Sequence, residues 1–255
     1  MNIVTTINDW REISAKHQAH SVGFIPTMGN LHAGHLSLCQ RSRDENQITV
    51  VSIFVNPTQF NQSQDFDLYP RTLQADKDLL SAEKVDYLFL PEPKTIYPDQ
   101  YQVQVHETEL SLELEGAYRP GHFTGMLSVV LKLLNIIQPT RAYFGEKDYQ
   151  QLLLIKKMVQ ALFLPIEIIA CETIRATDGL ALSSRNSRLT DEQRRLAAHF
   201  PQLLSSTLSL EEIRKKLQQL NFKVDYIAEK WQRRLGAVWL DDIRLIDNIP
   251  IGETC

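Results

Sequence analysis

Short apolar runs recur through the first two thirds of the chain at regular intervals. They lie at 22–25, 48–55, 85–90, 141–144 and 166–170. The run at 48–55 is nearly continuously apolar, which is typical of a strand that is buried on both faces of a sheet. Pro26, Pro91 and Pro165 stand beside three of the runs, as expected where a strand begins or ends.

Helical periodicity fills the intervals between these runs. It predicts helices over 34–43, 73–84, 123–137 and about 148–164. Strands that alternate with helices indicate an α/β domain built on a mainly parallel sheet, with a Rossmann-like architecture. One further segment, 101–105, alternates apolar and polar positions, which predicts a half-exposed strand.

The composition changes after about residue 175. A polar stretch at 177–188 leads to a helix that begins near Thr190 or Asp191. A second helix begins near Ser209, with Glu212 at the spacing of a capping box. The last segment, 237–249, is β-like.

This change predicts two domains. Residues 1–175 form a nucleotide-binding Rossmann-like domain, and residues 176–255 form a small C-terminal α+β domain. No internal repeat or Gly/Ser-rich linker interrupts either of them.

Charge and cysteine usage exclude several classes of function. The chain has 255 residues, with 27 basic and 31 acidic side chains for a net charge of −4, and no block of like charge. We therefore expect no nucleic-acid or membrane-surface role. The most apolar stretch, 126–137, is too short to span a bilayer. The three cysteines form no CxxC pair, which predicts reduced thiols and a cytoplasmic protein.

The segment from Gly23 to Leu38, GFIPTMGNLHAGHLSL, carries the strongest chemical pattern. A strand ends at Pro26, a tight turn follows, and His32 and His35 open a helix one turn apart. The N–H groups and the positive dipole end of a helix start favour a phosphate. The same residues also suit a pair of helix-capping histidines or a two-histidine metal site, although no third metal ligand is obvious nearby.

HxGH at the first strand-to-helix junction resembles the nucleotidyltransferase superfamily that attacks ATP at its α-phosphorus. The whole run resembles the pantothenate synthetase (pantoate–β-alanine ligase) family. Six further segments continue this resemblance in order, namely SIFVNPTQF (52–60), YPRT (69–72), RPGHFTG (119–125), GEKDYQQL (145–152), DGLALSSRN (178–186) and RLIDN (244–248).

The resemblance implies an ATP-dependent ligase that forms pantoyl adenylate and then couples it to β-alanine, giving pantothenate and AMP. His35, His32 and Lys147 would be the catalytic residues. The ATP-binding set would be Met28, Gly29, Asn30, Leu31, His32, Ala33, Gly34, His35, Gly145, Glu146, Lys147, Asp148, Ile174, Leu182, Ser183, Ser184 and Arg185.

Two glutamines complete the implied site. The amide of Gln59 follows a buried strand and can both donate and accept, which suits a hydroxy acid. The family pattern makes Gln59 and Gln151 the pantoate-binding pair, with Gln59 also facing β-alanine and Asn56 supporting the site. In the segment LSSR, Leu182 stands where the family usually has Met, a nearly volume-conserving change.

Mg²⁺ would accompany ATP and be held mainly by the nucleotide's own oxygens. Asp76 falls near a position that the family links to magnesium, but the adjacent position is Ala75. We therefore interpret Asp76 as a charge on a helix surface and predict no protein-held metal.

Three expectations concern the rest of the molecule. The region 222–249 is shorter than the family pattern implies, which predicts a reduced C-terminal lid. A homodimer is implied by the resemblance alone. The alternative function is an HxGH nucleotidyltransferase that adenylylates its substrate without forming an amide.

Overall fold

The computed structural model describes residues 1–61, 66–67 and 69–252, and the chain divides into two compact units. The first comprises Met1–Glu146 and Gln150–Cys171. The second comprises Glu172–Cys255 together with the short segment Lys147–Tyr149, which joins it although it lies between residues of the first. Cys255 lies outside the described residues.

The first unit is built on a six-stranded sheet in the order β1-β4-β3-β2-β5-β6, and every pair of neighbours is parallel. The strands are β1 (Asn2–Val4), β2 (Val22–Thr27), β3 (Ile48–Ile53), β4 (Tyr87–Phe89), β5 (Arg141–Gly145) and β6 (Glu167–Cys171). All six residues of β3 are buried, as its apolar run predicts.

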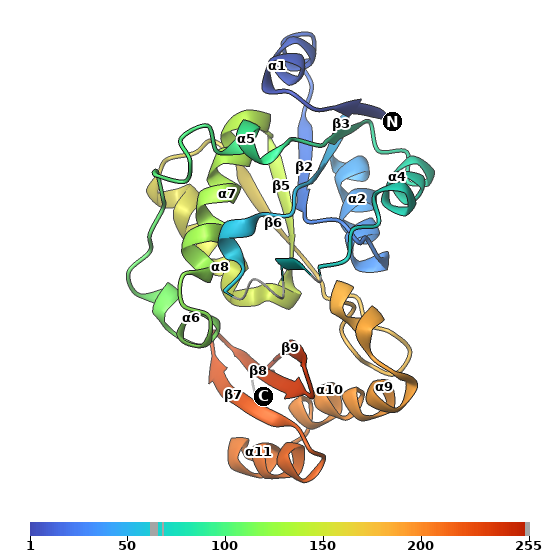
Figure 1. The fold of residues 1–255 in the computed structure, drawn as a ribbon, viewed down its shortest axis with the longest axis vertical. Helices are drawn as coiled ribbons and strands as arrows, with labels where there is room; N and C mark the ends of the chain where they lie inside the picture. Colours follow the sequence, from blue (N-terminus) through green and yellow to red (C-terminus); the bar gives the residue numbers. More distant parts are fainter. Residues whose placement is uncertain (62–65, 68, 253–255) are drawn as a thin grey trace. The chain divides into compact units, whose positions relative to one another are not determined.

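Helices cover both faces of this sheet (Figure 1). The main ones are α1 (Ile7–Ala15), α2 (Ala33–Glu45), α4 (Leu73–Ala82), α7 (His122–Ile137) and α8 (Tyr149–Ala161), and the short ones are α5 (Pro93–Ile96) and α6 (Glu115–Tyr118). Parallel neighbours need right-handed crossovers. The chain moves one way from β2 through β4 and the other way from β4 through β6, so α2 and α4 lie on one face and α7 and α8 on the other.

Local sequence explains the longest of these helices. Eleven of the sixteen residues of α7 are buried, most of them apolar, so it packs as a core helix. It ends at Gln138, which adopts a left-handed conformation with φ of 51°, because Pro139 cannot continue the helix. Among the helices of the described residues, none is both long enough and apolar enough to cross a membrane.

The predicted strand at 101–105 is wrong. The segment has no regular structure, and Val103 is 66% exposed. Val105 donates its backbone N–H to Ser128 Oγ of α7 instead of to a neighbouring strand. The alternation of apolar and polar residues therefore does not form a strand here, because the segment pairs with no neighbouring strand. Conversely, β1 and α1 were not predicted.

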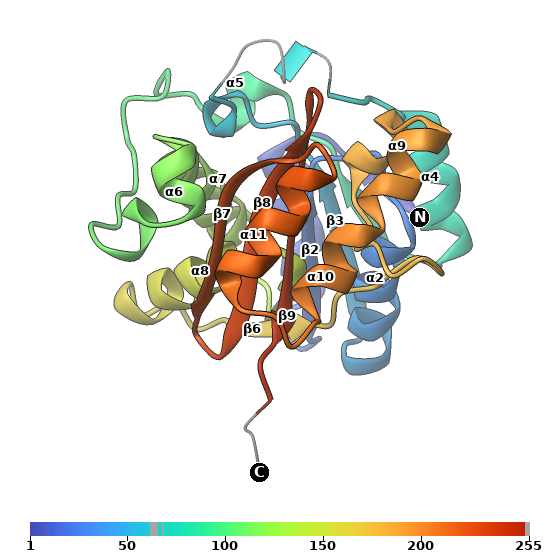
Figure 2. The ribbon, with the colours of Figure 1, turned by 90° about the horizontal axis from the view of Figure 1, so that it is seen from below.

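The second unit places helices on one face of an antiparallel sheet. Its sheet has the order β7 (Lys223–Lys230), β8 (Arg233–Leu240), β9 (Ile243–Pro250). Its helices are α9 (Asp191–Ala197), α10 (His199–Leu204) and α11 (Leu210–Gln219), and Figure 2 shows α10 and α11 across the sheet. Phe200, Leu217 and Val238 lie in the core between these layers.

Capping explains where two of these helices begin. Ser209 and Glu212 form a reciprocal capping box at α11, as the sequence predicts. Thr190 and Gln193 form another at α9, where the sequence predicts only the helix start. Strand β7 was not predicted. It pairs along its length with β8 through a two-residue turn at Trp231 and Gln232, both with positive φ.

Together the two units form a parallel α/β domain and a small α+β domain, the fold class that the sequence predicts.

Candidate active site

Three of the predicted segments follow neighbouring strands of the first unit. β2 lies between β3 and β5, and the crossover direction reverses at β2. In open α/β sheets, ligands bind outside the carboxyl ends of the strands at such a switch point. The HxGH turn (Met28–His35) follows β2, the loop with Gln59 follows β3, and Gly145 ends β5. The chain topology therefore gathers these segments at one edge of the sheet.

The HxGH turn needs a left-handed backbone. Gly29 has φ of 81° and Asn30 has φ of 50°, so two consecutive residues lie in the left-handed region. Thr27 begins the turn by accepting the N–H of Gly29 on Oγ1, at 3.2 Å, while donating to Ser52 O of β3. A Cβ at Gly29 would lie 3.0 Å from the carboxylate of Asp76, so the position also requires a small residue.

Asp76 closes the turn from the first turn of α4. Its Oδ2 accepts the N–H of Asn30 at 3.0 Å, and its Oδ1 accepts the N–H of Leu31 at 2.8 Å. Thr72 Oγ1 donates to the same carboxylate at 3.2 Å. The residue is only 2% exposed, so our interpretation of Asp76 as a surface charge is wrong. A buried carboxylate is retained where backbone N–H groups replace the lost water.

The two histidines of HxGH have defined tautomers. His32 caps α2, and its Nδ1 accepts the N–H of Gly34 at 3.1 Å. The Nδ1 of His35 accepts the N–H of His32 at 3.4 Å. Because a backbone N–H can only donate, both Nδ1 atoms carry no proton, and the proton of each neutral ring lies on Nε2. The rings lie 4.1 Å apart between centroids, so the turn carries two adjacent Nε2–H donors at a helix start.

Gln59 lies beside this turn and is held on both sides of its amide. Its Nε2 is 3.1 Å from Met28 Sδ, and its Oε1 accepts from Asn56 Nδ2 at 3.1 Å. Asn56 is 1% exposed and accepts the hydroxyl of Tyr97 at 2.7 Å while donating to Gly125 O at 3.2 Å. Asn56 therefore supports the loop from within the core.

The backbone of Gln59 is also fixed, by the start of α7. His122 Nδ1 lies 2.8 Å from Gln59 O, and Arg119 lies 3.1 Å from His122 Nε2. A guanidinium can only donate and a carbonyl can only accept, so His122 is neutral with its proton on Nδ1. Gly125 allows this approach, because a Cβ there would lie 2.3 Å from Thr58 O.

The two adjacent glutamines of α8 differ. Gln150 is buried and forms three hydrogen bonds, donating to Leu110 O and Glu113 O and accepting the N–H of Glu115. Gln151 is half-buried, and its side chain makes no hydrogen bond within the described part of the chain. Gln150 therefore serves packing, whereas the predicted residue, Gln151, keeps its amide available.

Beyond β5 the chain forms a short 3-10 turn, Glu146–Asp148. Lys147 is largely covered, with 18% of its side chain exposed, and its Nζ lies 3.8 Å from the carboxylate of Asp148. Lys147 groups with the second unit, while Gly145 and Glu146 belong to the first.

The remaining predicted residues lie in the second unit. The carbonyl of Ile174 accepts the N–H of Leu182 at 3.0 Å, which with the Arg175–Ala181 bridge closes a small hairpin. Ser183 caps the 3-10 helix Ser184–Arg188 by accepting the N–H of Arg185 at 3.3 Å. Leu182, Ser183, Ser184 and Arg185 are all half-buried.

Sequence reasoning missed several residues that hold these segments. Asp76, His122 and Asn248 each anchor a backbone atom of a predicted site residue or of its turn. His122 and Asn248 lie in the motifs RPGHFTG and RLIDN, which were noticed without a role for these residues, so motif membership was the available signal. Asp76 follows YPRT by four residues and was interpreted as a surface charge. Among residues 1–61, 66–67 and 69–252, no group of three or more His, Cys, Asp or Glu side chains could hold a metal ion.

The parallel sheet carries an HxGH turn at its switch point, and two histidines lie there at a helix start with their Nε2 atoms as donors. This combination defines a nucleotide-binding α/β protein of the HxGH class. A sequence profile of the family described as pantoate-beta-alanine ligase matches residues 2–250. The chain belongs to this family.

Individual relatives agree with this assignment. The chain is 50% identical to the pantothenate synthetase of Coxiella burnetii over 98% of its own length and 97% of the relative's. It is 52% identical to that of Legionella pneumophila (strain Corby), over 97% and 99% of the two lengths. A solved pantoate-beta-alanine ligase from Francisella tularensis, complexed with beta-gamma ATP and beta-alanine, is 43% identical, covers 98% of both chains and has a TM-score of 0.94.

The match spans nearly the whole length of each of these relatives. Residues 222–249 form most of a three-stranded sheet, and their shortening relative to the family pattern stays a prediction.

Proposed function

We propose that this chain condenses pantoate with β-alanine to pantothenate, with conversion of ATP to AMP and diphosphate. The pantoate carboxylate attacks the α-phosphorus of ATP, diphosphate leaves, and pantoyl adenylate forms. The amine of β-alanine then attacks the acyl carbon and releases AMP. Family membership over residues 2–250 supports the reaction, and the complex of the Francisella relative supports ATP and β-alanine as substrates.

The observation that carries the mechanism is the orientation of the His32 and His35 rings by backbone N–H groups. Both rings direct their Nδ1 to the backbone, so Nε2–H is the hydrogen-bond donor for a phosphate oxygen. Negative charge develops on the phosphate oxygens and on diphosphate as the reaction proceeds. Donors that are already oriented stabilise this charge without reorganisation. Lys147 adds a cation for the same charge.

The other ATP contacts follow from the family pattern. Ser183, Ser184 and Arg185 bind the triphosphate. The nucleotide also contacts Met28, Gly29, Asn30, Leu31, Ala33, Gly34, Gly145, Glu146, Asp148, Ile174 and Leu182. In this proposal the unit of residues 1–146 and 150–171 supplies the ATP and pantoate domain, and residues 172–255 supply a lid with the SSR segment.

Gln59 and Gln151 orient pantoate. Gln59 is supported through its own amide by Asn56 and through its backbone by His122, so it presents a fixed polar group. The hydroxyl and the carboxylate of a hydroxy acid require both donors and acceptors, which amides provide. Gln59 also faces β-alanine in the second step.

Mg²⁺ enters with ATP and is held by the phosphate oxygens. The carboxylate of Asp76 already accepts two backbone N–H groups and a hydroxyl, so it does not fit the role of a metal ligand. The chemistry that the cation would supply there is a reduced repulsion between the triphosphate and the attacking carboxylate.

The protein acts in the cytoplasm as a homodimer. Burial raises the pKa of the Cys39 thiol to about 12 and raises the pKa of Cys171, so both thiols are unreactive, as suits a reducing compartment.

For the dimer, β6 is an edge strand, and Leu162 and Phe163 of the preceding turn are 47% and 91% exposed. A second copy of the chain that covers this surface would account for both the open edge of β6 and the exposed apolar side chains. Light scattering of the wild type and of Phe163→Ser tests the dimer.

One experiment separates this function from the nucleotidyltransferase alternative. The protein is incubated with MgATP, pantoate and labelled diphosphate, with and without β-alanine. We expect exchange of label into ATP that requires pantoate but not β-alanine, and we expect pantothenate and AMP when β-alanine is added. Exchange without pantoate, or an adenylylated final product, would contradict the proposal.

A further inference from the structure

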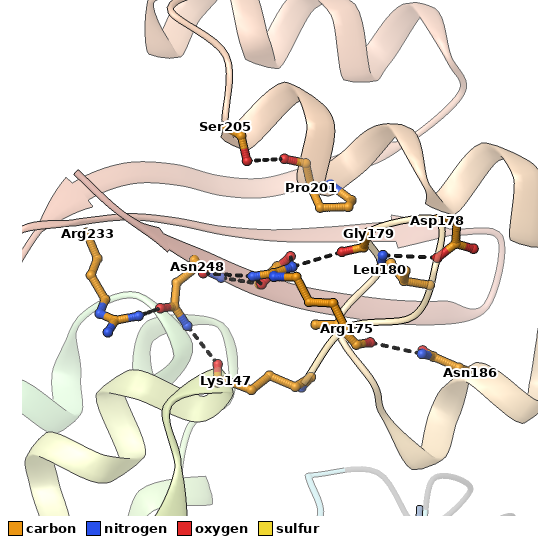
Figure 3. Close-up of polar contacts among 12 residues, drawn as sticks. Lys147, Arg175, Asp178, Gly179, Leu180, Asn186, Pro201, Ser205, Arg233 and Asn248 are labelled. Atoms are coloured by element: carbon orange, nitrogen blue, oxygen red, sulfur yellow. Dashed lines mark hydrogen bonds and ion pairs between the residues drawn. The ribbon is translucent and has the colours of Figure 1, made fainter. Parts of the chain in front are cut away.

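The RLIDN segment at 244–248 ends in two buried polar residues whose contacts the proposed reaction does not use. Asp247 and Asn248 lie on β9 and are 3% and 2% exposed. Figure 3 shows Asn248 between Arg233 and Lys147. Its Nδ2 donates to the main-chain oxygen of Lys147 at 2.9 Å, and its Oδ1 accepts from Arg233 at 2.6 Å.

The orientation of this amide follows from its partners. A carbonyl only accepts and a guanidinium only donates, so Nδ2 must face Lys147 O and Oδ1 must face Arg233. An aspartate has the same shape and could still accept from Arg233, but it cannot donate to the carbonyl. The position therefore uses both ends of an amide.

Arg233 also contacts the segment Lys147–Tyr149 directly. Its guanidinium lies over the ring of Tyr149, 4.2 Å from the centroid, while it donates to Asn248. Trp231, in the β7–β8 turn, lies 6.5 Å from Tyr149 between ring centroids. The segment Lys147–Tyr149 is thus bound at its first residue by an amide and at its last residue by a cation–π contact.

Asn248 is itself anchored by the residues around it. Asp247 forms a two-pronged ion pair with Arg175, with N–O distances of 2.7 and 2.9 Å, and accepts the N–H of Asn248 at 2.7 Å. Arg175 also donates to Gly179 O at the start of the loop that leads to the SSR segment. Buried groups with this many partners are held in one geometry.

We propose that Asn248 and Arg233 are positioning residues that hold the main chain of Lys147, and through it the ammonium that faces the α-phosphate. The inference rests on the proposed catalytic role of Lys147. A positioned cation stabilises developing charge only if it is already in place. The RLIDN segment and the β7–β8 turn therefore act on the chemical step without contacting a substrate.

The test uses Asn248→Asp, which keeps the shape but removes the donor to Lys147 O. The measured quantity is pantoate-dependent exchange of labelled diphosphate into ATP. We expect the maximal rate to fall about 10- to 100-fold, the effect of a small misplacement of a catalytic group. The KM values for ATP and pantoate should stay within about threefold, because only a transition-state interaction is lost.

Arg233→Lys is the second variant, in case Asn248→Asp does not fold. It keeps the charge but loses the planar group that both stacks on Tyr149 and binds Asn248, so we expect the same pattern. Its matched control is Arg234→Lys. Arg234 is adjacent on β8, but it binds Leu204 O, Ser206 O and Glu229, none of which belongs to the Lys147 segment. Asn221→Asp, at an exposed turn, controls for the change of charge.

A double-mutant cycle distinguishes positioning from a general structural role. If Asn248 acts through Lys147, Asn248→Asp should have less than a twofold effect on the residual rate in a Lys147→Ala background. An equal loss in both backgrounds would contradict the proposal, as would a rate within twofold of wild type for both folded variants. If the wild type shows no pantoate-dependent exchange, the proposed function itself fails.

Discussion

The HxGH turn in the first unit and the SSR segment in the second differ in burial and in the groups that hold them in place. In the turn, one buried carboxylate and the backbone satisfy each other, and both histidines are oriented by main-chain N–H groups. The SSR residues are half-buried, and the hairpin before them is held by ion pairs of partly exposed arginines, Arg175 with Asp247 and Arg194 with Asp178.

This difference fits the work proposed for each segment. Groups that stabilise a transition state must be oriented before the reaction, which burial and full hydrogen bonding achieve. A segment that closes on a large, charged nucleotide must let it enter, so partial exposure is expected. Lys147 combines the two cases, because its side chain is proposed to stabilise charge in the reaction while Asn248 holds its backbone oxygen.

The largest effect should come from Lys147→Ala. Loss of the cation should lower pantoate-dependent diphosphate exchange by roughly 10²–10³-fold, because the charge of the α-phosphate loses a main partner in a water-poor site. Lys16→Ala, at an exposed position, is the control. Exchange within threefold of wild type would show that Lys147 is not catalytic.

His35→Ala should be next, with adenylation reduced by roughly 10²-fold through loss of one oriented donor. The variant also loses the bond to His32 N, so a thermal melt must accompany the kinetics. The exposed His20 provides a control for the general loss of an imidazole, as His20→Ala. Adenylation within twofold of wild type in folded protein would remove the assigned role.

Gln151→Ala and Gln150→Ala should separate binding from packing on one helix. We expect Gln151→Ala, like Gln59→Ala, to raise the KM for pantoate at least tenfold with little change in ATP binding, because each variant would lose a proposed hydrogen bond to that acid. Gln150→Ala should instead lower stability by about 2–4 kcal/mol by leaving buried backbone groups unpaired. Kinetics and denaturant unfolding measure the two effects. A raised KM for Gln150→Ala together with a loss of stability for Gln151→Ala would show that Gln150 binds pantoate and Gln151 serves packing.

Asp76→Asn should have a smaller effect on rate. The amide keeps one acceptor but turns a donor toward the N–H of Asn30 or Leu31, which loosens the HxGH turn. We expect a roughly tenfold lower rate and a loss of about 1–3 kcal/mol in stability. Asp78→Asn, on the exposed side of the same helix, is the control. A loss of Mg²⁺ affinity without a loss of stability would instead support a metal role for Asp76.

The smallest effect should come from Asp178 and Arg194 beside the SSR segment. The hydrogen bond from Arg194 lowers the pKa of Asp178 below its usual value. A depressed folded-state pKa contributes stability that is complete above the unfolded value of about 3.9 and is lost as the pH falls through the folded value. Asp178→Asn should therefore cost about 0.5–1 kcal/mol at pH 7 and progressively less as the pH falls below about 3.9, as thermal melts at pH 7 and at an acidic pH would show. An equal cost at both pH values would exclude the ion pair as the cause.

Local patterns predicted much of the fold. The continuous apolar runs became β2 to β6, and the periodic segment 123–137 became nearly all of α7. The capping residues Thr190 and Ser209 marked helix starts correctly, because a cap acts within four residues. The missed strands have different causes. β1 has three residues, and the turn that pairs β7 with β8 is built from Trp231 and Gln232, neither of which is a typical turn residue.

By itself, the sequence determined the alternation of strands and helices, the HxGH turn and its neighbours, and hence the family and the chemistry. Only the tertiary structure decided which groups hold them. Asp76 meets Leu31 across 45 residues, and Asn248 meets Lys147 across 101. Local propensity carries no information on such pairs, because a carboxylate at the start of a helix is equally suited to water or to a buried turn until the packing excludes the water.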